Sequence, residues 1–129
     1  MALHLDWVAV DCADPLRMAR FWAEALDYEV KDEDEDEDEF LLVSRDGSRR
    51  RLLFLRVPEP KQVKNRLHFD LRPDDQEAEV ARLERLGAKR IDIGQGDATW
   101  VVMADPEGNE FCVLRALTEQ EKRDVPYGD

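Results

Sequence analysis

The chain has 129 residues, of which 43% are hydrophobic and 39% charged, and its net charge is -12 at pH 7. This length suits one globular domain with a sizeable core, and the negative charge argues against nucleic acid and anionic membranes as partners, since both are polyanions. No stretch approaches the roughly 20 apolar residues of a membrane span, and the start of the chain lacks the features of a signal peptide. Two cysteines, Cys12 and Cys112, do not make a secreted disulfide framework. We therefore expect a reduced, cytoplasmic protein.

The first half of the sequence predicts a strand, a helix and three further strands. Residues 5–10 are apolar with the two-residue period of a strand. Asp14 followed by Pro15 is typical of a helix start, because aspartate caps free backbone N–H groups and proline lacks the N–H that would be unpaired there. Apolar residues then recur at three- and four-residue spacing, and we expect Phe21 and Trp22 to lie in the core between helix and sheet. The later strands are expected at residues 28–31, 40–45 and 51–57.

Eight consecutive acidic residues, at positions 32–39, stand between two of these strands. Their charges repel one another and are costly to bury, so we expect a solvated loop or hairpin arm. Loose capture of divalent cations is an alternative role, although no spacing of ligands singles out one site.

The second half repeats the same order after a short, stiff linker that contains Pro58 and Pro60. Asp74 and Asp75 open a second helix, which Gly87 ends as a C-cap. The helix boundaries of the two halves are related by an offset of 60 residues, with Asp14, Leu26 and Asp27 matching Asp74, Leu86 and Gly87. Strands are expected at residues 67–71, 89–93, 99–103 and 109–114.

A long repeat that occurs only twice favours two half-modules closing one core. The predicted fold is α+β: two tandem βαβββ modules form a curled, cup-shaped mixed β-sheet with the helices outside. All 129 residues then form a single domain. Its parts are module one at about 4–57, a linker at 58–65, module two at about 66–115 and a polar C-terminal tail at 116–129, whose end should fray.

Strand alternation assigns side chains to the helix side or to the cup. Two cysteines fall on opposite faces, Cys12 toward the helix and Cys112 toward the cup, so we expect no disulfide between them. Leu67, Phe69 and Leu71 are assigned to the helix side. The cup is expected to receive Trp7, Ala9, Asp11, Phe54, Arg56, His68, Asp70, Arg72, Glu110, Cys112 and Leu114.

Four segments resemble the vicinal oxygen chelate superfamily of glyoxalases, bleomycin-resistance proteins and extradiol dioxygenases. They are VDCADP at 10–15 with Phe21-Trp22, VPEPK at 57–61, LHFDL at 67–71 and WVVMADPEGNEF at 100–111. They look most like the bacterial glyoxalase-like domain branch, and the resemblance covers about residues 5–115. It implies the paired-module fold and a homodimer.

In the metal-dependent members that the chain resembles, one ligand comes from each of four strands. These positions fall on Trp7, Phe54, His68 and Cys112, of which only His68 is a typical ligand, while Cys112 suits a soft metal such as zinc. The resemblance thus implies a dismantled octahedral site, and we predict no metal and no cofactor. An irregular site of His68, Asp70 and Cys112, with Glu110 nearby, is the less favoured alternative, because His68 and Asp70 stand roughly 7 Å apart along the strand. We favour a pocket-wall His68 that is hydrogen-bonded to Asp70 or Arg56.

The function predicted first is binding of a small organic ligand without a metal, in the manner of bleomycin-resistance proteins, inside an aromatic cup. The ligand-binding residues are expected to be Trp7, Phe54, Arg56, His68, Asp70, Trp100, Glu110 and Cys112. The alternative is a lyase, isomerase or dioxygenase-type enzyme in which His68 is the catalytic base or a metal ligand. In it, Asp70 orients His68, and Arg56 or Arg72 holds a carboxylate substrate.

Cys112 is a further candidate nucleophile for such an enzyme, although nothing in the sequence predicts a depressed pKa. The missing ligands argue against glyoxalase activity on glutathione adducts, which needs a metal to stabilise an enediolate. A structural or regulatory dimer with no ligand is the third hypothesis.

Overall fold

The computed structural model describes residues 2–124, and the chain divides into two compact units, residues 1–61 and 62–129. The boundary falls inside the predicted linker. Each unit contains one four-stranded mixed sheet, and the order of elements is β-α-β-β-β in both. The predicted α+β fold of two βαβββ modules is confirmed.

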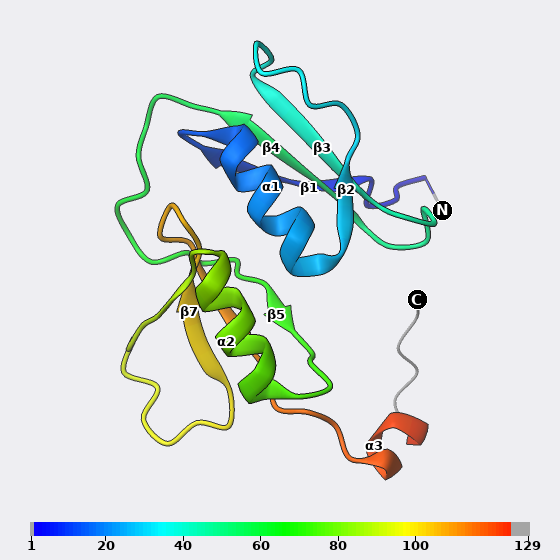
Figure 1. The fold of residues 1–129 in the computed structure, drawn as a ribbon, viewed down its shortest axis with the longest axis vertical. Coiled ribbons are helices and arrows are strands. Elements are labelled where there is room, and N and C mark those ends of the chain that lie inside the picture. The colour runs from blue at the N-terminus through cyan, green and yellow to red at the C-terminus, as the bar shows by residue number, and fades with distance from the viewer. Residues whose placement is uncertain (1, 125–129) are drawn as a thin grey trace. The chain divides into compact units, whose positions relative to one another are not determined.

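The first unit pairs its strands in the order β1-β4-β3-β2 (Figure 1). β1 runs parallel to β4, and the remaining neighbours are antiparallel. Its elements are β1 (Trp7–Cys12), α1 (Pro15–Leu26), β2 (Tyr28–Val30), β3 (Glu39–Ser44) and β4 (Arg51–Arg56).

The second unit repeats this topology with shorter strands, in the order β5-β8-β7-β6, and β5 runs parallel to β8. β5 covers two residues rather than the predicted 67–71, and Leu67, which we had placed on the helix side, is 89% exposed outside it. The elements are β5 (Asp70–Leu71), α2 (Gln76–Leu86), β6 (Lys89–Arg90), β7 (Val101–Ala104), β8 (Glu110–Val113) and α3 (Glu119–Asp124).

Both long helices begin and end at the predicted signals. Asp14 accepts a hydrogen bond from the backbone N–H of Arg17, and Asp75 accepts one from Ala78. Asp27 and Gly87 then end α1 and α2 in the left-handed conformation, with φ of 57° and 119°. The predicted offset of 60 residues holds at the C-terminal ends of the two helices, at Asp27 and Gly87. At their N-terminal ends the second N-cap is Asp75 and not the predicted match, Asp74.

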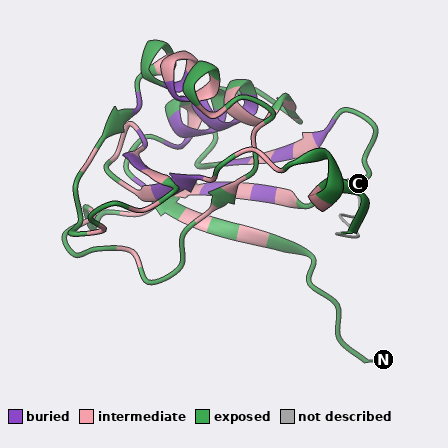
Figure 2. Cartoon of the chain, turned by 90° about the horizontal axis from the view of Figure 1, so that it is seen from below, coloured by how far each residue is buried: buried purple, intermediate pink, exposed green. Residues whose placement is uncertain are grey.

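The apolar core of the first unit lies between α1 and one face of its sheet. α1 contacts all four strands, and its buried side chains include Phe21 and Trp22, whose rings meet edge to face at 5.2 Å. In Figure 2 most of the buried residues lie within helices and strands, while most of the connecting segments are exposed or half-buried. The predicted core role of Phe21 and Trp22 is confirmed.

The acidic tract at 32–39 is exposed along its whole length, and only its last residue belongs to a strand. Glu33 pairs with Arg20 and Asp38 with Arg56, at 3.1 and 3.2 Å. This agrees with a solvated loop. None of the helices in the described residues has the length and apolar character that crossing a membrane requires.

Candidate functional site

His68, Asp70 and Cys112 come together on one face of the second unit. Asp70 in β5 stands opposite Cys112 in β8, and His68, which precedes β5, brings its ring within 3.1 Å of the Asp70 carboxylate. The nearest ligand atoms of the three side chains all lie within 4.8 Å of one another. The spacing of roughly 7 Å along the backbone therefore does not keep the ligand atoms apart, because the side chains converge beyond the backbone.

Backbone hydrogen bonds hold these two segments side by side. The N–H of Cys112 donates to the carbonyl of Phe69 at 2.9 Å, and the N–H of Leu114 donates to Leu71 at 2.8 Å. On its other side β8 pairs with β7, where Val102 stands opposite Cys112. Cys112 thus sits on a central strand, while His68 and Asp70 come from the edge of the sheet.

His68 and Asp70 form a hydrogen-bonded pair, with 3.1 Å between Nδ1 and Oδ1. This is the contact that we favoured for His68. When Nδ1 carries the proton and donates to Asp70, the other ring nitrogen, Nε2, is left as a base or a ligand atom. Both side chains are partly open to solvent, at 37% and 49% exposure, so a ligand can reach them.

Cys112 is buried, with 8% of the residue exposed, and its surroundings favour the protonated thiol. Burial raises the pKa of this thiol, and the charge of Asp70 and a hydrogen bond to Asp70 raise it further, whereas the charge of Lys64 opposes them. A thiol with a raised pKa supplies little thiolate at neutral pH. Cys112 is therefore poorly suited to be a nucleophile in the metal-free protein.

Glu110, two residues before Cys112 on β8, is engaged elsewhere. Its Oε1 accepts a hydrogen bond from the backbone N–H of Asn65 at 2.8 Å, and the Asn65 side chain donates to Asn109 at 3.1 Å. Among the described residues, the cluster of metal-competent groups contains His68, Asp70 and Cys112 but not Glu110. In this structure Glu110 anchors the start of the second unit.

The predicted faces of Phe54 and Arg56 are wrong. Phe54 is fully buried and stands opposite Val10 and Phe40, on the side of the sheet that packs against α1. Arg56 follows on the same side, where it donates to the carbonyl of Ala13 at 2.6 Å. The run Leu52–Leu55 is apolar at every position, so the sequence offered no alternation from which to choose the face.

Two tryptophans outside the core remain exposed, Trp7 at 40% and Trp100 at 41%. Trp7 begins β1, and the guanidinium of Arg51, its neighbour on β4, lies 5.2 Å from the ring centroid. Asp6 forms an ion pair with the same arginine. Trp100 directly precedes β7 in the second unit. That the two units contribute to one cup stays a prediction.

The donor set at His68, Asp70 and Cys112 does not fit a hard, octahedral metal site. Manganese-type ions prefer oxygen donors and imidazole, whereas a thiolate selects softer ions such as zinc. On β4, the residues that share the face of Trp7 are Arg51, Leu53 and Leu55, and none of them is a metal ligand. The four-strand site that the resemblance implied is thus missing its two ligands from the first unit.

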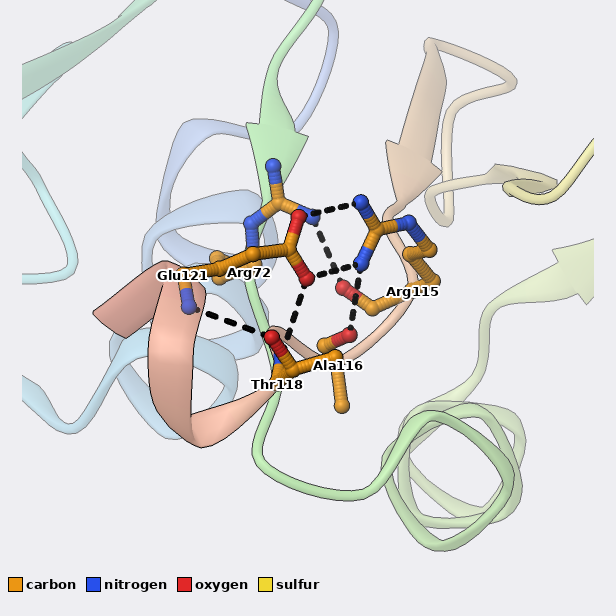
Figure 3. Close-up of polar contacts among 5 residues, drawn as sticks. All are labelled: Arg72, Arg115, Ala116, Thr118 and Glu121. Atoms are coloured by element: carbon orange, nitrogen blue, oxygen red, sulfur yellow. Dashed lines mark hydrogen bonds and ion pairs between the residues drawn. The ribbon is translucent and has the colours of Figure 1, made fainter. Parts of the chain in front are cut away.

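A group that we did not predict lies at the C-terminal end of the second unit (Figure 3). The guanidinium of Arg115 binds both carboxylate oxygens of Glu121, at 2.8 and 2.6 Å. Thr118 and Glu121 cap α3 reciprocally through two backbone N–H bonds of 2.9 and 3.1 Å. The spacing Thr-x-x-Glu is the sequence signature of such a capping box, and it was available in the polar tail at 118–121.

Arg72 joins this group from the end of β5. Its guanidinium donates to the carbonyl of Arg115 at 2.7 Å and so ties the segment after β5 to the segment after β8. Arg56 and Arg72, the two predicted holders of a substrate carboxylate, therefore both bind backbone carbonyls in this structure.

The family described as "Glyoxalase-like domain" matches the sequence over residues 7–114. No curated protein matches the chain.

Solved structures share the fold at low sequence identity. One is a glyoxalase/bleomycin resistance protein/dioxygenase family enzyme from Burkholderia phytofirmans PsJN, with a TM-score of 0.67 and 18% identity over 89% of this chain and 100% of that one. Another is a mutant of the fosfomycin resistance protein FosX from Listeria monocytogenes, in complex with Mn(II) and 1S,2S-dihydroxypropylphosphonic acid. Its TM-score is 0.65, with 16% identity over 97% of this chain and 100% of that one. A third is TnmS3, an antibiotic binding protein from Streptomyces sp. CB03234, with a TM-score of 0.62 and 19% identity over 91% of this chain and 99% of that one.

Proposed function

Since the chain belongs to the glyoxalase-like domain family of the vicinal oxygen chelate superfamily, we propose that it binds a small organic molecule at the His68–Asp70–Cys112 face, without needing a metal. The observation that carries the proposal is the convergence of these three side chains within 4.8 Å on a face that solvent reaches. The antibiotic binding protein TnmS3, which has a similar fold, supports a binding role.

The chemistry of this face defines the ligand class. Asp70 accepts hydrogen bonds, His68 accepts or donates through Nε2, and the Cys112 thiol is a weak donor. A hydroxyl or amine on the ligand satisfies the first two groups. The negative charge of Asp70 and the net charge of -12 disfavour anions, so the ligand is neutral or cationic. Trp100, which is exposed in the same unit, offers a flat apolar surface for a ring.

The test is a screen of neutral and cationic aromatic compounds by protein-observed NMR, with amide shifts of the second unit as the readout. Binders should shift the amides around His68, Asp70 and Cys112, and their affinity should fall by about tenfold or more in His68→Ala and Asp70→Asn, because each variant removes a hydrogen bond in a desolvated contact. His4→Ala is the matched control, since His4 is the other histidine and is exposed near the N-terminus. Binders that shift only other residues, or that bind both site variants normally, would refute the proposal.

A second candidate function is general base catalysis by His68, favoured by its 3.1 Å contact with Asp70. A carboxylate that accepts a hydrogen bond from one imidazole nitrogen fixes the tautomer and orients the ring, which leaves the other nitrogen to take a proton from a substrate. Any turnover found for a binder should fall by about 10² or more in His68→Ala, with a smaller loss in Asp70→Asn. Turnover that survives His68→Ala would exclude this mechanism while leaving the binding proposal intact.

We also propose that the protein is a cytoplasmic homodimer. Leu3 and Leu5, near the N-terminus, are 87% and 57% exposed, and a partner copy would cover such apolar side chains. Cys12 and Cys112 form no disulfide in the part of the chain that the structure describes, which fits a reducing compartment. Light scattering after size exclusion should give twice the chain mass of 15.0 kDa, and a monomer at micromolar concentration would contradict the proposal.

A further inference from the structure

The side-chain chemistry of the second unit departs from the hard-metal site of its family. The donors available there are one imidazole, one carboxylate and one thiol. A thiolate ligand favours zinc, cadmium or cobalt over manganese and magnesium, whose preferred donors are oxygens. The two positions in the first unit that would complete an octahedral set hold no ligands. The set of ligands that remains has three members, one of them a soft thiolate, and all three belong to the second unit.

We infer that His68, Asp70 and Cys112 form a thiophilic metal site, which binds one zinc-type ion through a single unit of the fold. The inference shares its side chains with the proposed ligand face, so metal and organic ligand would compete or combine there. It goes beyond the proposed function, which needs no ion.

Distances support this assignment. Zinc lies about 2.0 Å from an imidazole nitrogen and about 2.3 Å from a thiolate sulfur, so tetrahedral ligands are roughly 3.5 Å apart. Nδ1 of His68 and Oδ1 of Asp70 are 3.1 Å apart, so an ion bound by both atoms would replace the hydrogen bond between them, and no pair of ligand atoms in the cluster exceeds 4.8 Å. Rotation about side-chain bonds closes the remaining gap of about 1 Å without moving the strands.

The surroundings also favour a cation. Asp70 carries a negative charge into the cluster, and the partial exposure of His68 and Asp70 lets a hydrated ion approach. The backbone bonds from Cys112 to Phe69 and from Leu114 to Leu71 fix the two ligand-bearing segments side by side, so little chain entropy is lost on binding. Three protein ligands leave one tetrahedral position open, as in catalytic zinc sites.

The test uses the purified protein, stripped of metal, and titrates cobalt(II) alone, followed by zinc(II) and manganese(II) in competition. A thiolate–cobalt charge-transfer band should rise and saturate at one ion per chain. Zinc should abolish the band, whereas the same concentration of manganese should leave it in place. No organic ligand is present, so failure here leaves the binding proposal untouched.

Variants then assign the band to its ligands. Cys112→Ser should abolish it, and His68→Ala and Asp70→Asn should weaken cobalt binding by at least about tenfold. Cys12→Ser is the matched thiol control and should keep the band. A protein in which five acids of the tract at 33–37 become amides controls for loose cation capture and should also keep it.

Three results would overturn the inference: no thiolate band in the parent protein, a band that survives Cys112→Ser, or a band that disappears with Cys12→Ser in a folded protein. Circular dichroism checks the fold of each variant. If Cys112→Ser does not fold, His68→Ala and Asp70→Asn still decide, because unchanged cobalt affinity in both excludes the site.

Discussion

The two units share their topology but differ in what their side chains do. In the first unit α1 buries six residues, and they pack against strands that carry the buried rings of Phe40 and Phe54. In the second unit α2 buries only Val80 and Leu83, and two of the strands have two residues each. The metal-competent cluster is in this second, less regular unit.

This difference has a physical basis. A side chain that binds a ligand must keep polar groups open to solvent, whereas a core side chain gains stability by losing that exposure. His68 precedes the short strand β5 at the edge of its sheet, where its ring stays accessible. Phe54 occupies a central strand and is fully buried. The same topology thus buries more of its helix in the first unit, whereas the second unit keeps a core of its own around Met103 and Phe111 and also carries the polar cluster.

The largest expected effect is on the core of the first unit. Trp22→Ala removes a buried ring, and the lost burial plus the remaining cavity should lower the free energy of unfolding by about 3–5 kcal/mol. Trp7→Ala is the matched control, because Trp7 is 40% exposed whereas Trp22 is 1% exposed, and it should cost less than about 1 kcal/mol. Urea unfolding measures both, and equal losses would contradict the core that we assign to the first unit.

The helix ends compare the two units directly. Gly87 ends α2 at φ 119°, where a side chain is strained although its Cβ would meet no neighbour. Gly87→Ala should therefore cost about 1–2 kcal/mol through the backbone alone.

The reciprocal change, Asp27→Gly at φ 57°, is the control for this prediction. It relieves the left-handed strain but makes the unfolded chain more flexible, so it should change stability by less than about 0.5 kcal/mol. Urea unfolding of both variants is the measurement. A loss of stability of about the same size at both positions would contradict the explanation from left-handed backbone strain.

Features set by local chemistry were predictable from the sequence. Asp14, Asp75 and Gly87 act through their own backbone neighbourhoods, so the helix boundaries and the duplicated topology followed from spacing alone. The face of Phe54 did not, because the apolar run around it has no alternation and only packing against α1 decides it. Strand alternation placed His68, Asp70 and Cys112 on one face, but their convergence depends on side-chain rotation that no sequence pattern specifies. The expected strand at Leu67 failed because pairing with β8 begins only at Asp70.

The state of the Cys112 thiol offers a chemical comparison with Cys12 in the first unit. The charge and hydrogen bond of Asp70 contribute to the raised pKa of Cys112, so Asp70→Asn should lower that pKa and increase the thiolate fraction at neutral and mildly alkaline pH. Alkylation of the metal-free protein, followed by mass spectrometry of each cysteine, should show faster modification of Cys112. Cys12 donates to the carbonyl of Leu55 within the sheet of the first unit and should react at its original rate. An equal acceleration at both cysteines would indicate general loosening instead.

The smallest effect concerns α3, which follows the last strand of the second unit and has no helical counterpart after β4. Arg115 and the Thr118 backbone hold the pKa of Glu121 at about 2, below its ordinary value of 4.5. Because the folded pKa is the lower one, the stabilisation is complete above about pH 4.5 and is lost as the pH falls toward 2. Amide shifts of residues 118–124 should therefore move toward random-coil values over that interval, and Glu121→Gln should produce part of this change at neutral pH. Glu119→Gln is the matched control, since Glu119 pairs with the exposed Lys122 and not with Arg115, and it should leave the acid transition in place. If α3 stays ordered at pH 2, the Arg115–Glu121 pair does not hold it.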